Sequence, residues 1–225
     1  MLGALSALAG AGFVRWQLER WFTPSTPYEL ERRADGFEVR RYPALVRAET
    51  EVYEATWRDA LREGFRRLAS YIFGQNRALL GMAAIPTAGE GVAVTVTPPL
   101  STPGTRGEKI AMTTPVMSSA TETRSAAEVS PFTVSFVMPS ERSVGSLPAP
   151  VDERVMLRDV PARRVAAMRY AGRAGVERTL RKGRELLARV AAEGLRPVGE
   201  PLFAAYDPPW TLPFLRRNEV WVEVE

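Results

Sequence analysis

The chain has 225 residues, of which 45% are apolar, and a formal net charge of +4. This composition excludes a disordered chain, and because the basic residues are spread along the sequence instead of being clustered, we expect no nucleic-acid partner. The sequence has no cysteine and no histidine, which excludes zinc centres built on these ligands, cysteine nucleophiles and Ser-His-Asp triads.

An apolar segment opens the chain. Residues 1–14 are apolar or small, and a stretch rich in Trp and Arg follows them. The apolar run is shorter than the ~20 residues that a membrane-spanning helix needs. We therefore separate residues 1–26 from a domain over residues 27–225. Three interpretations fit the first segment: a trimmed membrane anchor, a helix in the membrane interface, or a helix packed on the domain. Membrane association through residues 1–22 and the cellular compartment both stay open.

Strands followed by a helix are predicted in the first part of the domain. Apolar and polar residues alternate over residues 28–52, which indicates two or three antiparallel strands. From Thr56 the spacing becomes that of an amphipathic helix, which Thr56 caps and Gly74 ends. The apolar face of this helix consists of Trp57, Leu61, Phe65, Leu68 and Ile72.

The same order of elements recurs in the second half of the chain. Pro161-Ala162 lies 118 residues after Pro43-Ala44, again between two strand-like runs, and a second amphipathic helix that ends at Gly194 follows. After the helices we expect short strands at residues 111–115 and 204–208, then final strands at residues 132–138 and 220–224. Residues 77–107 and 118–130 are expected to be surface loops.

Two such units predict an α+β fold. Neither unit can bury its apolar faces alone, so we expect one distorted antiparallel sheet or β-barrel built from two pseudo-repeats. Two long amphipathic helices are expected to flank the sheet on its outside.

Three segments resemble the signatures of a known family. Residues 109–116, KIAMTTPV, resemble the KIAMTxPV signature of the SOUL/heme-binding protein family. Residues 206–220 are similar to its C-terminal signature, and residues 60–76 to its first helix and the turn that closes it. The resemblance spans about residues 27–225 and implies a distorted β-barrel of two pseudo-repeats.

The resemblance also implies binding of heme or free porphyrin, without catalysis, in a shallow apolar groove beside the first long helix. By position, this groove is lined by Arg62, Phe65 and Ser70 and by the loop Trp210–Phe214. The apolar face of a porphyrin would pack against Leu61, Phe65, Leu212 and Phe214. The arginines that could pair with a propionate are Arg62, Arg216 and Arg217.

No histidine or cysteine is present as an axial ligand, although some family members carry a histidine in that role. An iron ligand would have to come from Met, Tyr, Lys or water, and Met82, Met112, Met117 and Met138 are candidates by elimination, although core packing is the stronger interpretation for each. The expected role is transport, buffering or sequestration of a tetrapyrrole.

Two other classes of function are alternatives to tetrapyrrole binding. The same two-repeat barrel could serve as a small-ligand-sensing or protein-interaction module. An enzyme is not expected, because the paired carboxylates Glu219 and Glu223 fall at strand spacing and are predicted to face alternate or solvent positions. The sequence also lacks a P-loop and a dinucleotide fingerprint. The oligomeric state stays open.

Overall fold

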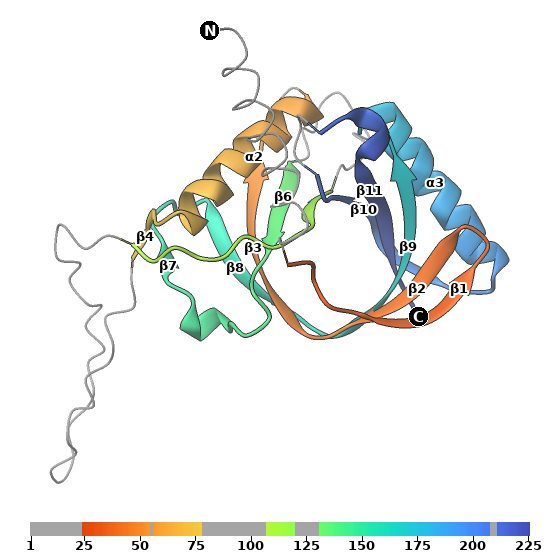
Figure 1. The fold of residues 1–225 in the computed structure, drawn as a ribbon, viewed down its shortest axis with the longest axis horizontal. Helices are drawn as coiled ribbons and strands as arrows, with labels where there is room; N and C mark the ends of the chain where they lie inside the picture. Colours follow the sequence, from red (N-terminus) through yellow and green to blue (C-terminus); the bar gives the residue numbers. More distant parts are fainter. Residues whose placement is uncertain (1–23, 55, 78–106, 120–130, 208–210) are drawn as a thin grey trace, which may run out of the picture.

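The computed structural model describes residues 24–54, 56–77, 107–119, 131–207 and 211–225. This part of the chain has an α+β fold, with one large antiparallel sheet and two long helices, as expected (Figure 1). The strands are β1 (Glu29–Ala34), β2 (Phe37–Tyr42), β3 (Leu45–Val52), β4 (Asn76–Arg77), β5 (Val116–Ser119), β6 (Phe132–Val137), β7 (Ala149–Pro150), β8 (Val155–Val160), β9 (Arg163–Ala171), β10 (Pro197–Ala205) and β11 (Arg217–Val224). The helices are α2 (Trp57–Ile72) and α3 (Val176–Ala192), and two 3-10 turns are η1 (Val144–Ser146) and η2 (Pro213–Leu215).

The two halves of the chain share one sheet by exchanging strands. The strand order is β1-β2-β9-β11-β10-β5-β6-β3-β8, so β2 pairs with β9 of the second half and β8 pairs with β3 of the first half. Only Pro43-Ala44 separates β2 from β3, and only Pro161-Ala162 separates β8 from β9. Figure 1 shows both connections running as nearly continuous ribbons from one side of the sheet to the other.

The sheet is strongly curved but not closed by hydrogen bonds. Figure 1 shows the strands curving around an inner face, with α2 and α3 on the outer face, as predicted. Among the described strands, β1 and β8 are the two edges, and no pairing joins them. The fold is therefore a curved open sheet with a helix over each side, and the closed barrel that the sequence suggested is not found.

Helix α2 forms where its capping signals predict. The Thr56 side chain accepts a hydrogen bond from the Asp59 amide, and Gly74, with φ of 108°, follows the last turn. The side chains of Leu68, Tyr71 and Ile72 are buried against β3, β6 and β8. Apolar residues at helical spacing thus hold α2 on one half of the sheet.

Helix α3 covers the other half in the same manner. Leu186 and Val190 are fully buried against β9, β10 and β11, and the outward-facing residues Met168 and Val220 belong to the same cluster. Gly194, with φ of 74°, lies just after the helix. Alternate residues of β9 and β11 therefore point to α3, while the residues between them point to the inner face.

Two of the predicted short strands differ from those observed. Residues 111–115 do not form a strand of the sheet. Thr114 makes only an isolated bridge, through backbone hydrogen bonds with Pro24 and Thr26 (2.9 and 3.0 Å), and β5 begins at Val116. In place of the strand predicted at 204–208, the structure has a longer strand that begins earlier: β10 runs from Pro197 to Ala205. Most of the two predicted loops, residues 78–106 and 120–130, lies outside the described residues.

Candidate functional site

One flank of α2 presents apolar side chains at the surface. Phe65 is 42% exposed, and its ring meets the buried Phe136 edge-on at 5.4 Å between centroids. Leu61, one turn earlier, is partly buried against the same cluster, and Phe73, just beyond the helix, is 62% exposed. This flank is therefore an apolar surface that continues into the core beneath it.

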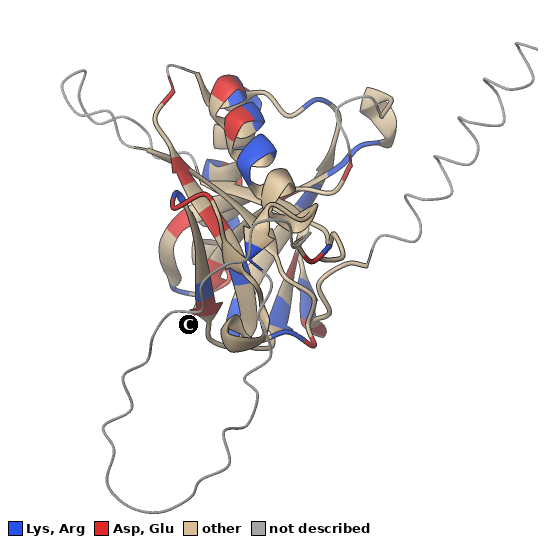
Figure 2. Cartoon of the chain, turned by 90° about the vertical axis from the view of Figure 1, so that its left-hand side faces the viewer, with Lys and Arg blue, Asp and Glu red and all other residues tan. Residues whose placement is uncertain are grey.

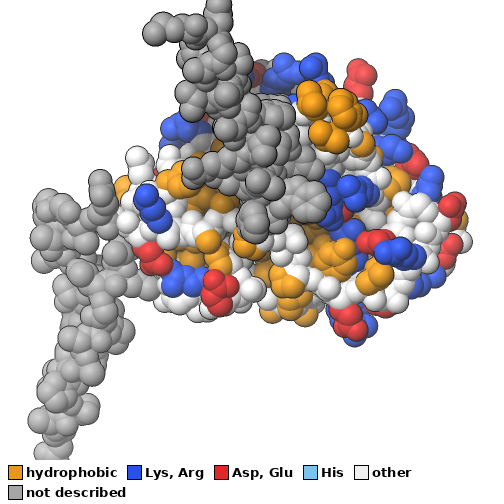
Figure 3. Space-filling view, viewed as in Figure 1, with side chains coloured by type: hydrophobic (Ala, Val, Ile, Leu, Met, Phe, Trp, Pro, Cys, Tyr) orange, Lys and Arg blue, Asp and Glu red, His pale blue; other side chains and the backbone are white. Residues whose placement is uncertain are grey.

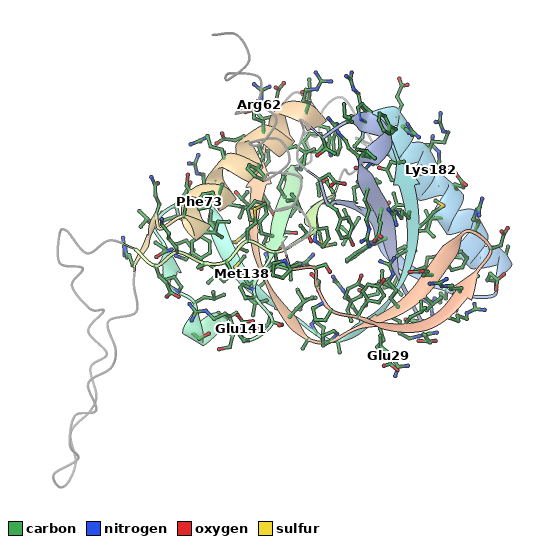
Figure 4. All side chains as sticks on the ribbon, in the orientation of Figure 1. Glu29, Arg62, Phe73, Met138, Glu141 and Lys182 are labelled. Atoms are coloured by element: carbon green, nitrogen blue, oxygen red, sulfur yellow. The ribbon has the colours of Figure 1, made fainter. Side chains whose placement is uncertain are left out.

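Arg62 lies beside this flank and points outward. Its side chain is 73% exposed and pairs with Asp59 on the same helix, and Figure 4 places it on the outer side of α2, away from the sheet. Figure 2 shows acidic and basic residues mixed over the side of the molecule that carries α2. Because exposed ion pairs contribute only about 0–1 kcal/mol, this pairing leaves the guanidinium available to another anion.

The C-terminal loop forms the second predicted part of the groove. Leu212 and Phe214 are 46% and 71% exposed, and Arg216 donates from Nε to the Thr211 carbonyl at 2.7 Å. Trp210 lies outside the described residues. Figure 3 shows hydrophobic side chains exposed in several groups among charged ones on one face of the molecule.

The structure therefore brings the predicted residues together as two local sets. Leu61, Arg62 and Phe65 share one helix, with Ser70 half-buried near its end, while Leu212, Phe214 and Arg216 share the loop around η2. Arg62 pairs with Asp59 on its own helix, and Arg216 donates to Thr211 in its own loop.

A buried charged cluster on the inner face escaped the sequence analysis. Glu219 is fully buried and shares its side of β11 with Glu223, so the prediction that the two carboxylates face alternate or solvent positions is wrong for Glu219. Its carboxylate accepts hydrogen bonds from four side chains. The donors and their shortest distances are Arg217 at 2.6 Å, Arg40 at 2.7 Å, Trp221 at 2.7 Å and Tyr206 at 2.9 Å. Arg217, expected as a third clamp for a propionate, belongs to this Glu219 cluster and also stacks on the Tyr206 ring at 3.9 Å.

The Glu219 cluster predicts how stability depends on pH. Burial alone would raise the pKa of Glu219, but the hydrogen bonds and charges of Arg40 and Arg217 outweigh it and hold the pKa at about 2, below its ordinary 4.5. Because the folded-state pKa is depressed, the stabilisation is complete above pH ~4.5 and is lost as the pH falls toward ~2, about 3 kcal/mol in all. Urea unfolding between pH 7 and pH 2 should show this loss in the parent chain and little of it in Glu219→Gln. Equal pH slopes in the two proteins would contradict the assignment.

The methionines named as possible iron ligands fill cores. Met117 and Met138 are 1% and 2% exposed, and Met112 packs against the cluster under α2. Met82 lies outside the described residues. Within the described ranges, no group of three or more His, Cys, Asp or Glu side chains is placed to hold a metal ion.

The membrane prediction falls on a segment outside the described residues. Residues 1–22 precede the first described residue, Pro24. None of the helices in the described part of the chain is long and apolar enough to cross a membrane.

Comparison with known proteins places the fold and the family. The C-terminal domain of EcmrR aligns with a TM-score of 0.54 at 10% identity, over 88% of this chain and 98% of that domain. EcmrR in a DNA complex aligns with the same score and identity, over 87% of this chain and 60% of that one. A hydrolase from Listeria innocua aligns with a TM-score of 0.47 at 12% identity, over 94% of this chain and 98% of that one. At 10% identity the likeness to EcmrR concerns the fold alone.

Sequence comparison is more specific. A search of the curated proteins gave no match. The family model of the SOUL heme-binding protein matches residues 23–95 and 101–223, and this match includes all three segments recognised in the sequence. The chain therefore belongs to the SOUL heme-binding protein family.

Proposed function

We propose that the protein binds heme or free porphyrin reversibly and without catalysis, on the apolar flank of α2 that carries Leu61 and Phe65. The observation that carries this proposal is the family match over residues 23–223, together with an exposed aromatic side chain on the helix that the family resemblance indicates. A porphyrin is a flat apolar molecule, and burying it against exposed apolar side chains is favourable by ~25 cal/mol per Å². The role that fits is transport, buffering or sequestration.

The chain's own residues are suited to a tetrapyrrole held without an axial histidine or cysteine. Neither residue type occurs in the sequence, so affinity has to come from apolar contact and from charge. Arg62 is exposed beside Phe65 and can exchange Asp59 for a propionate, with the planar guanidinium matching the carboxylate. Leu212, Phe214 and Arg216, with Trp210, would complete the site from the C-terminal loop.

We further propose that the sheet derives from two pseudo-repeats of a barrel-like unit. The strand order supports this proposal, because β9-β11-β10 in the second half corresponds to β3-β6-β5 in the first, and the two triplets meet at the β10–β5 pair. Each triplet carries one helix, and each is extended by a strand of the other half.

A titration with hemin and with protoporphyrin tests the ligand site. Phe65→Ala is expected to lower the affinity for both ligands about tenfold, which corresponds to the loss of ~1.4 kcal/mol of apolar contact. Arg62→Ala should lower the affinity for both ligands severalfold, because it removes the partner of the propionate. Absorbance and quenching of tryptophan fluorescence report the binding.

Matched variants on α3 serve as controls. Val176 is 41% exposed, against 42% for Phe65, and Arg181 is an exposed arginine, so Val176→Ala and Arg181→Ala should leave both affinities unchanged. Comparable affinities for hemin and protoporphyrin would support binding without an iron ligand. A strict requirement for iron, or equal losses in the α2 and α3 variants, would contradict the proposal.

A further inference from the structure

The inner face of the sheet contains a cavity of about 370 Å³ that tetrapyrrole binding on α2 does not use. Residues of β3, β5 and β6 line it from one half, and residues of β9, β10 and β11 line it from the other. Four strands separate β3 from β9 in the sheet, so the curvature brings their side chains to one space. The volume falls within the range of about 300–1,000 Å³ that is typical of small-molecule sites.

Two arginines in this cavity have buried donors without partners. The Nε atoms of Arg47 and Arg163 are both buried, and neither has a hydrogen-bond partner in the described structure. The carboxylate nearest to Arg47 is that of Glu49, at 3.9 Å, and no ion pair of Arg163 is found among the described residues. A buried donor left unpaired is unfavourable, so an acceptor that reached it would be favoured.

Burial opposes the positive charge of both guanidinium groups more than the nearby carboxylates favour it. Burial lowers the pKa of Arg47 and of Arg163, and the charge of Arg47 lowers that of Arg163 further, whereas the charge of Glu49 raises the pKa of Arg47 and that of Glu223 raises the pKa of both. Glu49 is already paired with Arg158. Glu200 and Glu223 also line the cavity, but both are exposed to solvent, where charge interactions are screened.

The rest of the lining is mixed, with apolar and polar side chains. Trp221, Val165 and Leu202 form part of the wall, and Ser119 and Thr133 line it from β5 and β6. The apolar part of the wall, beside the charged groups, can take the organic part of a small ligand.

We propose that this cavity binds a small organic anion, whose carboxylate or phosphate is held by Arg47 and Arg163 and whose apolar part packs against Trp221 and Leu202. A planar guanidinium donates two parallel hydrogen bonds to such groups. The inference goes beyond tetrapyrrole binding, because the cavity lies on the inner face of the sheet and α2 lies on the outer face.

Four probes of one size and different charge test the proposal with the full chain. Benzoate and phenyl phosphate present the two candidate anions, whereas benzamide is neutral and benzylamine is a cation. Isothermal titration calorimetry should show saturable binding of at least one anion, at least tenfold tighter than benzamide, with no binding of benzylamine. The preference between the two anions tells which acidic group the site prefers.

Arginine variants locate the binding. Arg47→Gln and Arg163→Gln should each weaken the bound anion at least tenfold, whereas Arg169→Gln, an exposed arginine on the same strand as Arg163, should have no effect. Thermal unfolding checks that each variant is folded, and both Gln variants should be as stable as the parent because they remove unpaired buried donors.

The outcomes separate this proposal from the tetrapyrrole site. Phe65→Ala should leave anion binding unchanged, and Arg163→Gln should leave porphyrin binding unchanged. Binding of benzamide or benzylamine as tight as that of the anions, no binding of either anion at millimolar concentration, or anion affinities that the Arg47 and Arg163 variants leave intact would each overturn the proposal.

Discussion

Replacing Glu219 with glutamine is expected to lower the free energy of unfolding by about 3–5 kcal/mol, the loss typical of a buried ion pair that keeps only one partner. Both carboxylate oxygens accept: Oε1 faces Arg217 and one nitrogen of Arg40, and Oε2 faces Tyr206, Trp221 and the other nitrogen of Arg40. An amide has one accepting oxygen and one NH₂ group. In either orientation, glutamine would turn its NH₂ toward donors.

The cost is large because Arg40 cannot reach water. The side chain of Arg40 is only 4% exposed, so its charge stays buried when the carboxylate is neutralised. Glu38, which also pairs with Arg40 at 2.8 Å, compensates only part of that charge, since it is 26% exposed.

Glu223→Gln is the matched control for this experiment. Glu223 lies on the same strand and the same side of the sheet as Glu219, four residues further on, but it is exposed. Its substitution should change the free energy of unfolding by no more than about 0.5 kcal/mol. Urea unfolding at pH 7, followed by circular dichroism, gives both values. Equal losses in the two variants would show that the Glu219 cluster does not stabilise the fold.

Gly64→Ala is expected to destabilise the protein by about 1–3 kcal/mol, although alanine normally stabilises a helix relative to glycine by about 1 kcal/mol. A Cβ atom at Gly64 would lie 2.5 Å from Cγ2 and 2.6 Å from Cβ of Val134. Val134 is fully buried on β6, so α2 and β6 would have to move apart.

Gly183, at the middle of α3, provides the control. A Cβ atom there would meet Pro201 at 3.4 Å, which is ordinary contact. Gly183→Ala should therefore stabilise the protein by up to about 1 kcal/mol. Thermal or urea unfolding distinguishes the two signs, and adding Val134→Ala to Gly64→Ala should recover part of the loss from the clash. A Gly64→Ala variant as stable as Gly183→Ala would refute the close packing of α2.

The sequence predicts the elements whose signals are local. Thr56 and Gly74 bound α2 as expected, and period-two alternation identifies β2, β3, β6 and β9. Segment 111–115 looks like a strand, but its backbone partners come from residues 24–26, about 90 residues earlier, and no local pattern reveals them. The bulge in β10, where Gly199 has φ of 73°, interrupts the alternation that would have marked the strand.

The two faces of the sheet differ in how well the sequence reveals them. The α2 flank is visible as apolar residues at helical spacing, and the family resemblance adds the loop around η2. The Glu219 cluster is not visible, because Arg40 and Glu219 lie 179 positions apart. The sequence does carry one signal for the cavity on the inner face. Arg47 and Glu49 occupy alternate positions on β3, and charged residues on a strand covered on both faces have to be paired or line a cavity.

The short links Pro43-Ala44 and Pro161-Ala162 tie the two halves into one thermodynamic unit. Since each half contributes a strand to the other, neither can open without breaking hydrogen bonds in both. We therefore expect a single cooperative transition, and a chain cut between the halves should yield fragments that fold only when mixed. A ligand bound on either face would then protect the whole molecule against heat or proteolysis, including the half that it does not touch.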